Sequence, residues 1–305
     1  MTSSKRPNPA AAASRPDAQW GFTDEELARY TLVFRDDLLQ GQVFLVSGGG
    51  SGLGRAIAYA LARLGADVMI CGRRADKLEE TAAGIRRHVG REIATQSMTI
   101  RDPEQVESLV ANTWQRFGRL DVLVNNGGGQ FPQPAIDFSP KGWRAVIDTN
   151  LNGSWYMMQA AAKQWRDRRS NGSVVNIVAN VWRGMPQVAH TCAARAGVIY
   201  LSKTLATEWA PLGIRVNCIS PGSVATEGFN AYPAEAARQF QFSNPLKALG
   251  DAYDIAQAVV YFAAPSGKFI TGEVLVIDGG NNQWGDVWPL GIPEYFKTNG
   301  SPPGS

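Results

Sequence analysis

Residues 43–54 read VFLVSGGGSGLG, an apolar run followed directly by a glycine-rich turn. The apolar run predicts a buried strand, and the spacing of Leu53, Ile57 and Leu61 puts one apolar stripe on a helix that begins inside the turn. Glycines let such a turn bend tightly and approach a diphosphate closely, while the start of the helix offers free N–H groups. The stretch therefore predicts a dinucleotide-binding loop. We expect its contacts from Gly48, Ser51, Gly52, Leu53 and Gly54.

Other glycine-rich loops do not fit these residues. A Walker phosphate loop needs Lys and then Ser or Thr after Gly54, but the chain continues with Arg55 and Ala56. A nucleophile elbow centred on Ser51 needs a glycine two residues later, where Leu53 stands. The glycines follow the pattern G-x-x-x-G-x-G rather than the strict G-x-G-x-x-G. A plain glycine-rich turn is the remaining alternative to the dinucleotide loop.

Strand and helix patterns alternate along the rest of the chain. Apolar runs without polar alternation predict strands that are buried on both faces, with amphipathic helices between them. This alternation predicts an α/β fold, a Rossmann-like doubly wound parallel sheet of about seven strands with helices on both faces, in a single domain. The apolar runs are 43–46, 68–71, 122–124, 174–178, 216–219 and 274–277.

The two ends of the chain differ from this regular pattern. The N-terminal stretch is rich in Ala, Ser and Pro, which is typical of disorder, and Thr23 and Glu26 then have the spacing of a helix capping box. Trp284, Trp288 and Tyr295 stand among Gly and Pro residues near the C-terminus. We expect a disordered segment 1–19, a helical extension 20–38, the main domain 39–280 and an aromatic tail 281–305.

Composition and charge narrow the range of partners. The chain has 30 basic and 27 acidic residues and no dense run of Lys and Arg, which argues against nucleic-acid and membrane partners. No stretch reaches the ~18 consecutive apolar residues of a membrane span. Three widely spaced cysteines and two histidines do not suggest a disulfide framework or a metal site. We expect a cytoplasmic protein that binds small molecules and no metal.

The residues after the second predicted strand suggest which dinucleotide binds. Cys71 is followed by Gly72, Arg73 and Arg74. An acidic residue here would bind the ribose 2′-OH of NAD, whereas glycine followed by arginine leaves room for a 2′-phosphate and pairs with it. The sequence thus predicts NADP(H), held by Arg73 and Arg74. The alternative is that both arginines only solvate the start of a helix.

Several motifs after the glycine loop resemble those of the short-chain dehydrogenase/reductase family. They are Asn125-Asn126-Gly127, Asn150 in the stretch TNLNG, Pro221-Gly222 and Asp278-Gly279-Gly280. The resemblance runs from about residue 39 to residue 280. It implies that the cofactor is also held by Asn125, Gly127, Pro221, Gly222, Val224 and Thr226.

The catalytic motif of that family is altered in this chain. Alignment puts Ala179 at the family's Ser, Thr191 at its Tyr and Arg195 at its Lys. A threonine hydroxyl does not ionise near neutral pH and arginine is not a proton source, so ordinary carbonyl reduction loses its acid. Conjugate reduction of an enoyl thioester is less demanding, because hydrogen-bond donors can hold the enolate. We expect Thr191 with Asn150 or Asn180 as donors, and Arg195 on the cofactor ribose.

A closer resemblance points to the same chemistry. NNGGGQF at 125–131, KGW at 141–143 and AARAGV at 193–198 resemble the branch of peroxisomal trans-2-enoyl-CoA reductases and 2,4-dienoyl-CoA reductases. The resemblance implies NADPH-dependent reduction of the double bond of an acyl-CoA. Two alternatives stay open: a dehydrogenase of terpenoid or other hydrophobic alcohols with an acid such as His190, and an NADP(H)-binding protein without catalysis. We also expect a homo-oligomer, either a tetramer or a dimer.

Three further features bear on the pocket. Residues 226–249 contain several aromatic side chains and are interpreted as a mobile lid over the substrate, with core helix packing as the alternative. Trp182 follows the strand that should open onto the pocket, where it can form a wall against an acyl chain or a surface loop. Lys203 lies eight residues after Arg195 and is interpreted as a solvated lysine rather than a relocated catalytic one.

Overall fold

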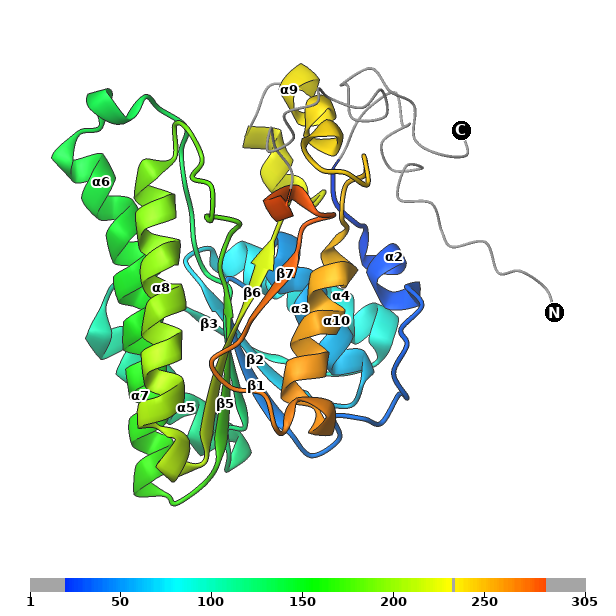
Figure 1. Cartoon of the computed structure of the whole chain (residues 1–305). Helices are drawn as coiled ribbons and strands as arrows, with labels where there is room; N and C mark the ends of the chain where they lie inside the picture. Colours follow the sequence, from blue (N-terminus) through cyan, green and yellow to red (C-terminus); the bar gives the residue numbers. More distant parts are fainter. Residues whose placement is uncertain (1–19, 232–233, 284–305) are drawn as a thin grey trace.

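One parallel sheet organises the described part of the molecule, which the computed structural model gives as residues 20–231 and 234–283. The strands lie in the order β3-β2-β1-β4-β5-β6-β7 (Figure 1). The predicted doubly wound parallel sheet of about seven strands is confirmed. The strands are β1 (Val43–Ser47), β2 (Asp67–Gly72), β3 (Ala94–Ser97), β4 (Val122–Asn125), β5 (Gly172–Ile177), β6 (Ile214–Pro221) and β7 (Val274–Ile277).

Strand β1 lies between β2 and β4, where the order of the strands reverses. All its residues are buried, and they alternate between the two faces of the sheet. Phe44 and Val46 pack into the core on one face, while Val43 and Leu45 pack into the core on the other. Because the chain leaves β1 and β4 toward opposite faces, a crevice forms at their carboxyl ends, the usual ligand site of such sheets.

Strand β3 is the one strand that the apolar runs did not indicate. Its sequence is ATQS, and Ala94 is its only buried residue. It pairs with β2 alone and so forms an edge of the sheet. An edge strand needs little apolar surface, because one side of its backbone faces no neighbouring strand. Its polar side chains therefore hid it from a search for apolar runs.

Helices cover both faces of the sheet (Figure 1). Helices α2, α3, α4 and α10 contribute to the core on one face, and α5, α7 and α8 contribute to the core on the other. Because each helix has an apolar stripe, each buries that stripe against the sheet. The α-helices are α2 (Asp24–Arg29), α3 (Gly52–Arg63), α4 (Ala75–Val89), α5 (Pro103–Phe117), α6 (Pro140–Ile147), α7 (Gly153–Asp167), α8 (Ala189–Glu208), α9 (Ala234–Gln239) and α10 (Ala252–Ala263).

The N-terminal extension packs against helices of the main domain. Thr23 accepts a hydrogen bond from the Glu26 amide and the Glu26 side chain accepts one from Thr23, so the predicted capping box is present. Tyr30 stacks on Tyr253 of α10 with ring centroids 4.2 Å apart. Asp24 bonds to the side chains of Arg55 and Tyr59 on α3. These contacts hold the extension beside the start of α3.

The predictions for the ends of the chain fall mostly outside the described residues. Segment 1–19 lies outside them, and so does the tail from residue 284 onward, including its tryptophans and Tyr295. Within the described ranges, none of the helices combines the length and the apolar character that crossing a bilayer requires.

Candidate functional site

A cleft opens at the carboxyl ends of β1, β2 and β4, where the strand order reverses. Its volume is about 250 Å³. The glycine loop, the turn after β2, the segment after β3 and the start of the segment after β4 form its walls. Of the residues predicted to bind the cofactor, those that line this cleft are Gly48, Ser51, Arg73, Arg74 and Gly127.

The glycine loop has a backbone that side chains would obstruct. Gly48 and Gly52 have φ values of +70° and +54°, in the left-handed region that favours glycine. A Cβ atom at Gly54 would overlap the carbonyl oxygen of Gly48 and lie 2.5 Å from Asn126 Nδ2. Ser51, the N-cap of α3, makes no side-chain capping bond. The first-turn amides of α3 are therefore not satisfied by the loop itself, as an anion-binding helix start requires.

Two residues outside the predicted site hold the loop against β4. Ser47 Oγ accepts hydrogen bonds from the amides of Asn126 at 3.1 Å and Gly127 at 2.9 Å. Asn126 Nδ2 donates to the carbonyl oxygens of Ser47 at 3.0 Å and Gly48 at 3.3 Å. Asn125, which was predicted to bind cofactor, instead points into the core and donates to Asn176 Oδ1 at 2.9 Å. Asn125 thus supports the site from behind.

Positive charge gathers around one end of the cleft. Arg73, Arg74, Lys77 and Arg101 line it, and the lining residues include no Asp or Glu. Lys77 pairs with Glu80 outside the cleft at 2.6 Å, and Arg101 Nε donates to Thr149 Oγ1. The sequence analysis missed Lys77 and Arg101. Lys77 lies in the first turn of α4, four residues after Arg73, so its closeness in sequence could have revealed it, whereas Arg101 comes from the segment after β3.

Arg195 lies buried at the other end of the site. Its exposed fraction is 8%, and burial lowers the pKa of its guanidinium to about 10, so the group stays charged near neutral pH. A Cβ atom at Gly128 would overlap this guanidinium and lie 3.0 Å from Asn150 Oδ1, so the three residues meet. Within residues 20–231 and 234–283, no ion pair to Arg195 is found. Burying a cation without a carboxylate partner costs free energy of folding, so such a group is typical of a site that binds a ligand.

Asn150 holds the segment after β4 in place beside Arg195. It lies in a π-helical turn, η2 (Asp148–Asn152), between α6 and α7. Its Oδ1 accepts the Gly129 amide at 3.0 Å, and its Nδ2 donates to the Gly129 carbonyl at 2.9 Å. Single π-turns inside helices are frequent at functional sites, because they redirect side chains. The Asn150 amide therefore holds the segment through one donor and one acceptor, and its second N–H is not used by these two bonds.

Thr191 lies at the start of α8 next to an aromatic cluster. The Thr191 amide donates to His190 Nδ1 at 2.8 Å, and the Thr191 hydroxyl oxygen is 3.4 Å from the same nitrogen. The His190 ring stacks on Phe138 at 4.4 Å and meets the edge of Phe131 at 4.6 Å. Burial lowers the pKa of His190, so the imidazole is neutral near neutral pH.

Comparison with known proteins identifies the family. Residues 48–282 match the family described as "Enoyl-(Acyl carrier protein) reductase". A probable 2,4-dienoyl-CoA reductase of Bacillus subtilis is 36% identical over 257 residues, which are 83% of this chain and 100% of the relative. The peroxisomal 2,4-dienoyl-CoA reductase of Danio rerio is 36% identical over 263 residues, 85% of this chain and 87% of the relative. The chain belongs to the short-chain dehydrogenase/reductase family. It is therefore an oxidoreductase of a family that uses nicotinamide cofactors.

A solved structure of another member of the short-chain dehydrogenase/reductase family has the same fold. It is the citronellol catabolism dehydrogenase of Pseudomonas aeruginosa, with a TM-score of 0.74 and 37% identity. The match covers 83% of this chain and 100% of that one. Relatives of this chain therefore carry the names of both acyl-CoA reductases and an alcohol-catabolism dehydrogenase.

The Pro221-Gly222 motif lies at the end of β6, and the segment that follows it reaches the glycine loop. Gly222 lies so close to Asp278 that a Cβ atom would come within 2.6 Å of the Asp278 Cα, and Val224 forms an isolated β-bridge with Gly250. A Cβ atom at Gly52 would lie 3.8 Å from the Thr226 side chain. Thr226 therefore lies beside the glycine loop, whereas Gly222 and Val224 contact Asp278 and Gly250.

Two other residues considered from the sequence lie away from Thr191 and Arg195. Asn180 Nδ2 donates to Asp278 Oδ2 at 2.8 Å and to Asn281 Oδ1 at 2.7 Å, so its donors engage the segment after β7. Lys203 is exposed on α8, with its ammonium over the ring of Tyr200. This position agrees with the interpretation of Lys203 as a solvated lysine.

Proposed function

We propose that this protein is an NADP(H)-dependent oxidoreductase that reduces the conjugated double bond of 2-enoyl-CoA thioesters. The observation that carries the proposal is the buried Arg195 guanidinium, which has no ion pair within the described residues and lies on the same helix as the non-ionisable Thr191. A site of this kind suits a reaction in which negative charge develops on an oxygen that needs no immediate proton. The enolate of a thioester is such a group.

The residues of the cleft fit a phosphorylated dinucleotide. The side chain of Ser51 does not cap the amides at the start of α3. Four cationic residues line the far end of the cleft, and no Asp or Glu is among the lining residues. A diphosphate fits the first feature and a 2′-phosphate the second. When bound, the nicotinamide supplies the hydride that reduces the β-carbon. We assign Gly48, Gly52, Leu53 and Gly54 to the diphosphate, and Arg73 and Arg74 to the 2′-phosphate.

The remaining residues stabilise the negative charge that develops on the substrate. Arg195 contributes a fixed positive charge between the cofactor ribose and the thioester oxygen, and Thr191 contributes a neutral donor. Asn150 positions Gly128 and Gly129 against the guanidinium, so the charge stays in place during the reaction. The α-carbon then takes a proton from water in a separate step, which does not depend on a phenol at position 191.

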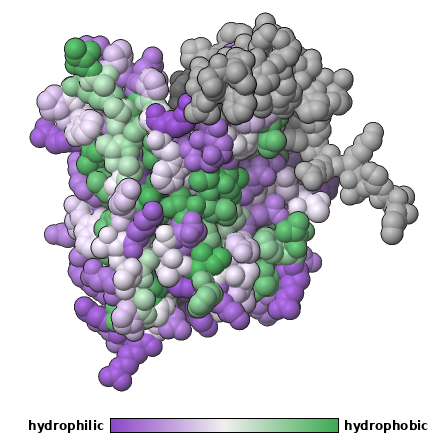
Figure 2. Space-filling view, in the orientation of Figure 1, coloured by the Kyte–Doolittle hydropathy of each residue, from purple (hydrophilic) through white to green (hydrophobic). Residues whose placement is uncertain are grey.

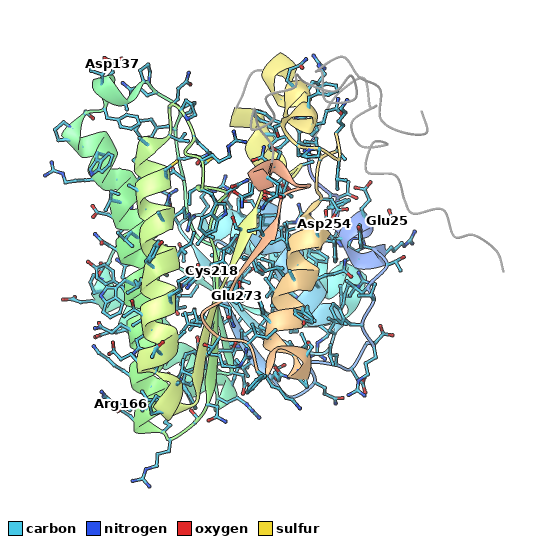
Figure 3. The ribbon with its side chains drawn as sticks, in the orientation of Figure 1. Glu25, Asp137, Arg166, Cys218, Asp254 and Glu273 are labelled. Carbon is cyan, nitrogen blue, oxygen red and sulfur yellow. The ribbon has the colours of Figure 1, made fainter. Side chains whose placement is uncertain are left out.

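An apolar rim beside Thr191 suits the acyl chain. The stack of His190, Phe138 and Phe131 leads outward to the partly exposed Trp143, 39% exposed, whose ring centroid is 6.4 Å from that of Phe138. The outer tip of this apolar rim, beyond Trp143, carries Ile136, which is 93% exposed. Figure 3 labels the neighbouring Asp137 at this tip, and Figure 2 shows hydrophobic surface there. Apolar side chains exposed beside a pocket favour a ligand with an apolar tail.

A direct assay tests the proposed reaction. Purified protein is mixed with NADPH and either crotonyl-CoA or a simple ketone, and the absorbance of NADPH is followed. We expect oxidation of NADPH with crotonyl-CoA and a saturated acyl-CoA as the product. Oxidation with the ketone alone would support the alternative, a dehydrogenase of hydrophobic alcohols, which the solved relative's name and the apolar rim favour. Binding of NADPH without turnover of either substrate would point to a non-catalytic protein.

Replacing Arg73 by aspartate tests the choice of cofactor. A charge-assisted hydrogen bond contributes about 1.5–3 kcal/mol, so its loss should weaken NADPH binding about 10- to 100-fold. Binding of NADH should be unchanged or stronger, because an acidic side chain can accept the ribose 2′-OH. The dissociation constants are measured by nucleotide fluorescence. Arg116→Asp, with the same charge change on the exposed surface of α5, is the control. An unchanged ratio of the two affinities would contradict the assignment.

The proposal also includes the assembly and the compartment. We propose a cytoplasmic homo-oligomer, a tetramer or a dimer, that acts on small molecules rather than on nucleic acid or membranes. Light scattering coupled to size-exclusion chromatography of the full chain measures the mass, and a monomeric mass would reject the oligomer.

A further inference from the structure

Glu227 occupies the place where the cofactor's diphosphate is proposed to bind. Its Oε2 accepts the Gly52 amide, the first residue of α3, at 3.0 Å. Its Oε1 lies 3.4 Å from Arg55 Nη1, and its side chain is 35% exposed. The Glu227 carboxylate thus supplies the capping acceptor that Ser51 does not supply.

A carboxylate and a diphosphate compete for such a place. Both are anions, both accept N–H donors, and both are stabilised by the positive end of the helix dipole. The Gly52 amide has one proton, so a diphosphate oxygen that takes it must release Glu227. The negative charge of Glu227 also repels a diphosphate that approaches the neighbouring amides. The free protein therefore holds its cofactor loop in a self-capped state.

Release of Glu227 would affect more than one side chain. Glu227 begins the short helix η4 (Glu227–Ala231), which belongs to the segment interpreted as a lid. Phe229 of η4 packs against Trp20, with ring centroids 5.2 Å apart, and against Phe240 at 5.1 Å. Arg55, the partner of Glu227, also bonds to Asp24 of the N-terminal extension. Glu227 thus links the glycine loop, the segment after β6 and, through Arg55, the N-terminal extension.

We propose that Glu227 is a carboxylate latch that closes the cofactor loop of the free protein and is displaced by the diphosphate of NADP(H). This inference rests on the proposed cofactor site and deepens it. Cofactor binding then frees η4 from the start of α3. The latch lowers the affinity for the cofactor, because part of the binding free energy is used to release Glu227.

The variant Glu227→Gln separates the charge from the shape. Glutamine keeps an acceptor for Gly52 but loses the negative charge, so NADPH should bind about 5- to 10-fold more tightly, within the range of a charge at a helix terminus. Glu25→Gln is the matched control: Glu25 is an exposed carboxylate of the N-terminal extension, paired with Arg29 and labelled in Figure 3. It should leave the NADPH affinity unchanged. Equal or weaker NADPH binding by Glu227→Gln would overturn the latch.

Hydrogen exchange on the unmodified protein gives a second, independent readout. NADPH should slow exchange at the amides of residues 48–54 and speed exchange at residues 227–231, because η4 loses its anchor on Gly52. Slower exchange in both segments would overturn the latch, and this measurement decides the matter if Glu227→Gln fails to fold. A protein that binds no NADPH would reject the proposed cofactor itself. Binding with an unaffected Glu227→Gln variant would reject the latch alone.

Discussion

Replacing Arg195 by methionine is expected to lower kcat for the enoyl-CoA substrate about 100- to 1000-fold, the usual effect of removing a group that stabilises an oxyanion. The guanidinium is the buried positive charge of the site, held against Gly128 and close to Asn150. Steady-state kinetics with NADPH and crotonyl-CoA measure the loss. Arg195→Lys should restore part of kcat, because it keeps a charge at that position but has neither the planar fork nor the length of arginine.

Arg195→Met is expected to lower activity but not the stability of the fold. A buried cation without an ion pair opposes folding, so Arg195→Met should unfold at a temperature equal to or above that of the unmodified protein. Lys203→Met on the exposed side of α8 is the control and should change neither kcat nor the unfolding temperature. If Arg195→Met keeps the activity of the unmodified protein, Arg195 has no role in catalysis. A large fall in its unfolding temperature would show that the side chain mainly supports the fold.

Replacing Gly54 by valine is expected to weaken NADPH binding at least about 10- to 100-fold, since overpacking of a closed site costs about 1–3 kcal/mol. The new side chain would meet the Gly48 carbonyl and the Asn126 amide, which together shape the glycine loop. Either the loop opens or α3 shifts away from β1, and both changes move the amides that face the diphosphate. Isothermal titration with NADPH measures the affinity, and circular dichroism on heating shows whether the variant folds.

Gly72→Ala is a control for folding alone, because Gly72 itself lines the cleft. A Cβ atom there would lie 3.6 Å from Leu78 Cδ2, an ordinary van der Waals distance. Gly72 has no positive φ, so the substitution should leave the unfolding temperature nearly unchanged. If Gly54→Val folds and binds NADPH like the unmodified protein, the diphosphate does not lie on this loop.

The fold could be predicted from local patterns because each part of it has a local cause. Four of the five residues of β1 are apolar and all five are buried, and the stripe from Leu53 to Leu61 has helical spacing. Thr23 and Glu26 form their capping box within four residues. The pattern failed at β3, where the residues TQS need no burial because the strand lies at the edge.

The site could be predicted only in part. The sequence indicated Arg73 and Arg74, which do line the cleft, but not Lys77 or Arg101, which line it too. Asn150 was predicted as a hydrogen-bond donor, and only the structure shows that its side-chain amide exchanges two hydrogen bonds with the backbone of Gly129. A residue type tells which bonds a side chain can make. It does not tell which partner the folded chain brings near.

By itself, the sequence determined the alternation of strands and helices, the glycine loop and the presence of a threonine, which does not ionise near neutral pH, at position 191. These follow from residue properties over a few neighbouring positions, such as apolar spacing, the freedom of glycine and the acidity of a side chain. Only the tertiary structure decided that Ser47 meets Gly127, that Gly128 meets Arg195 and that Glu227 caps Gly52. Those pairs are up to 175 residues apart, and only the assembled sheet places their loops at one edge.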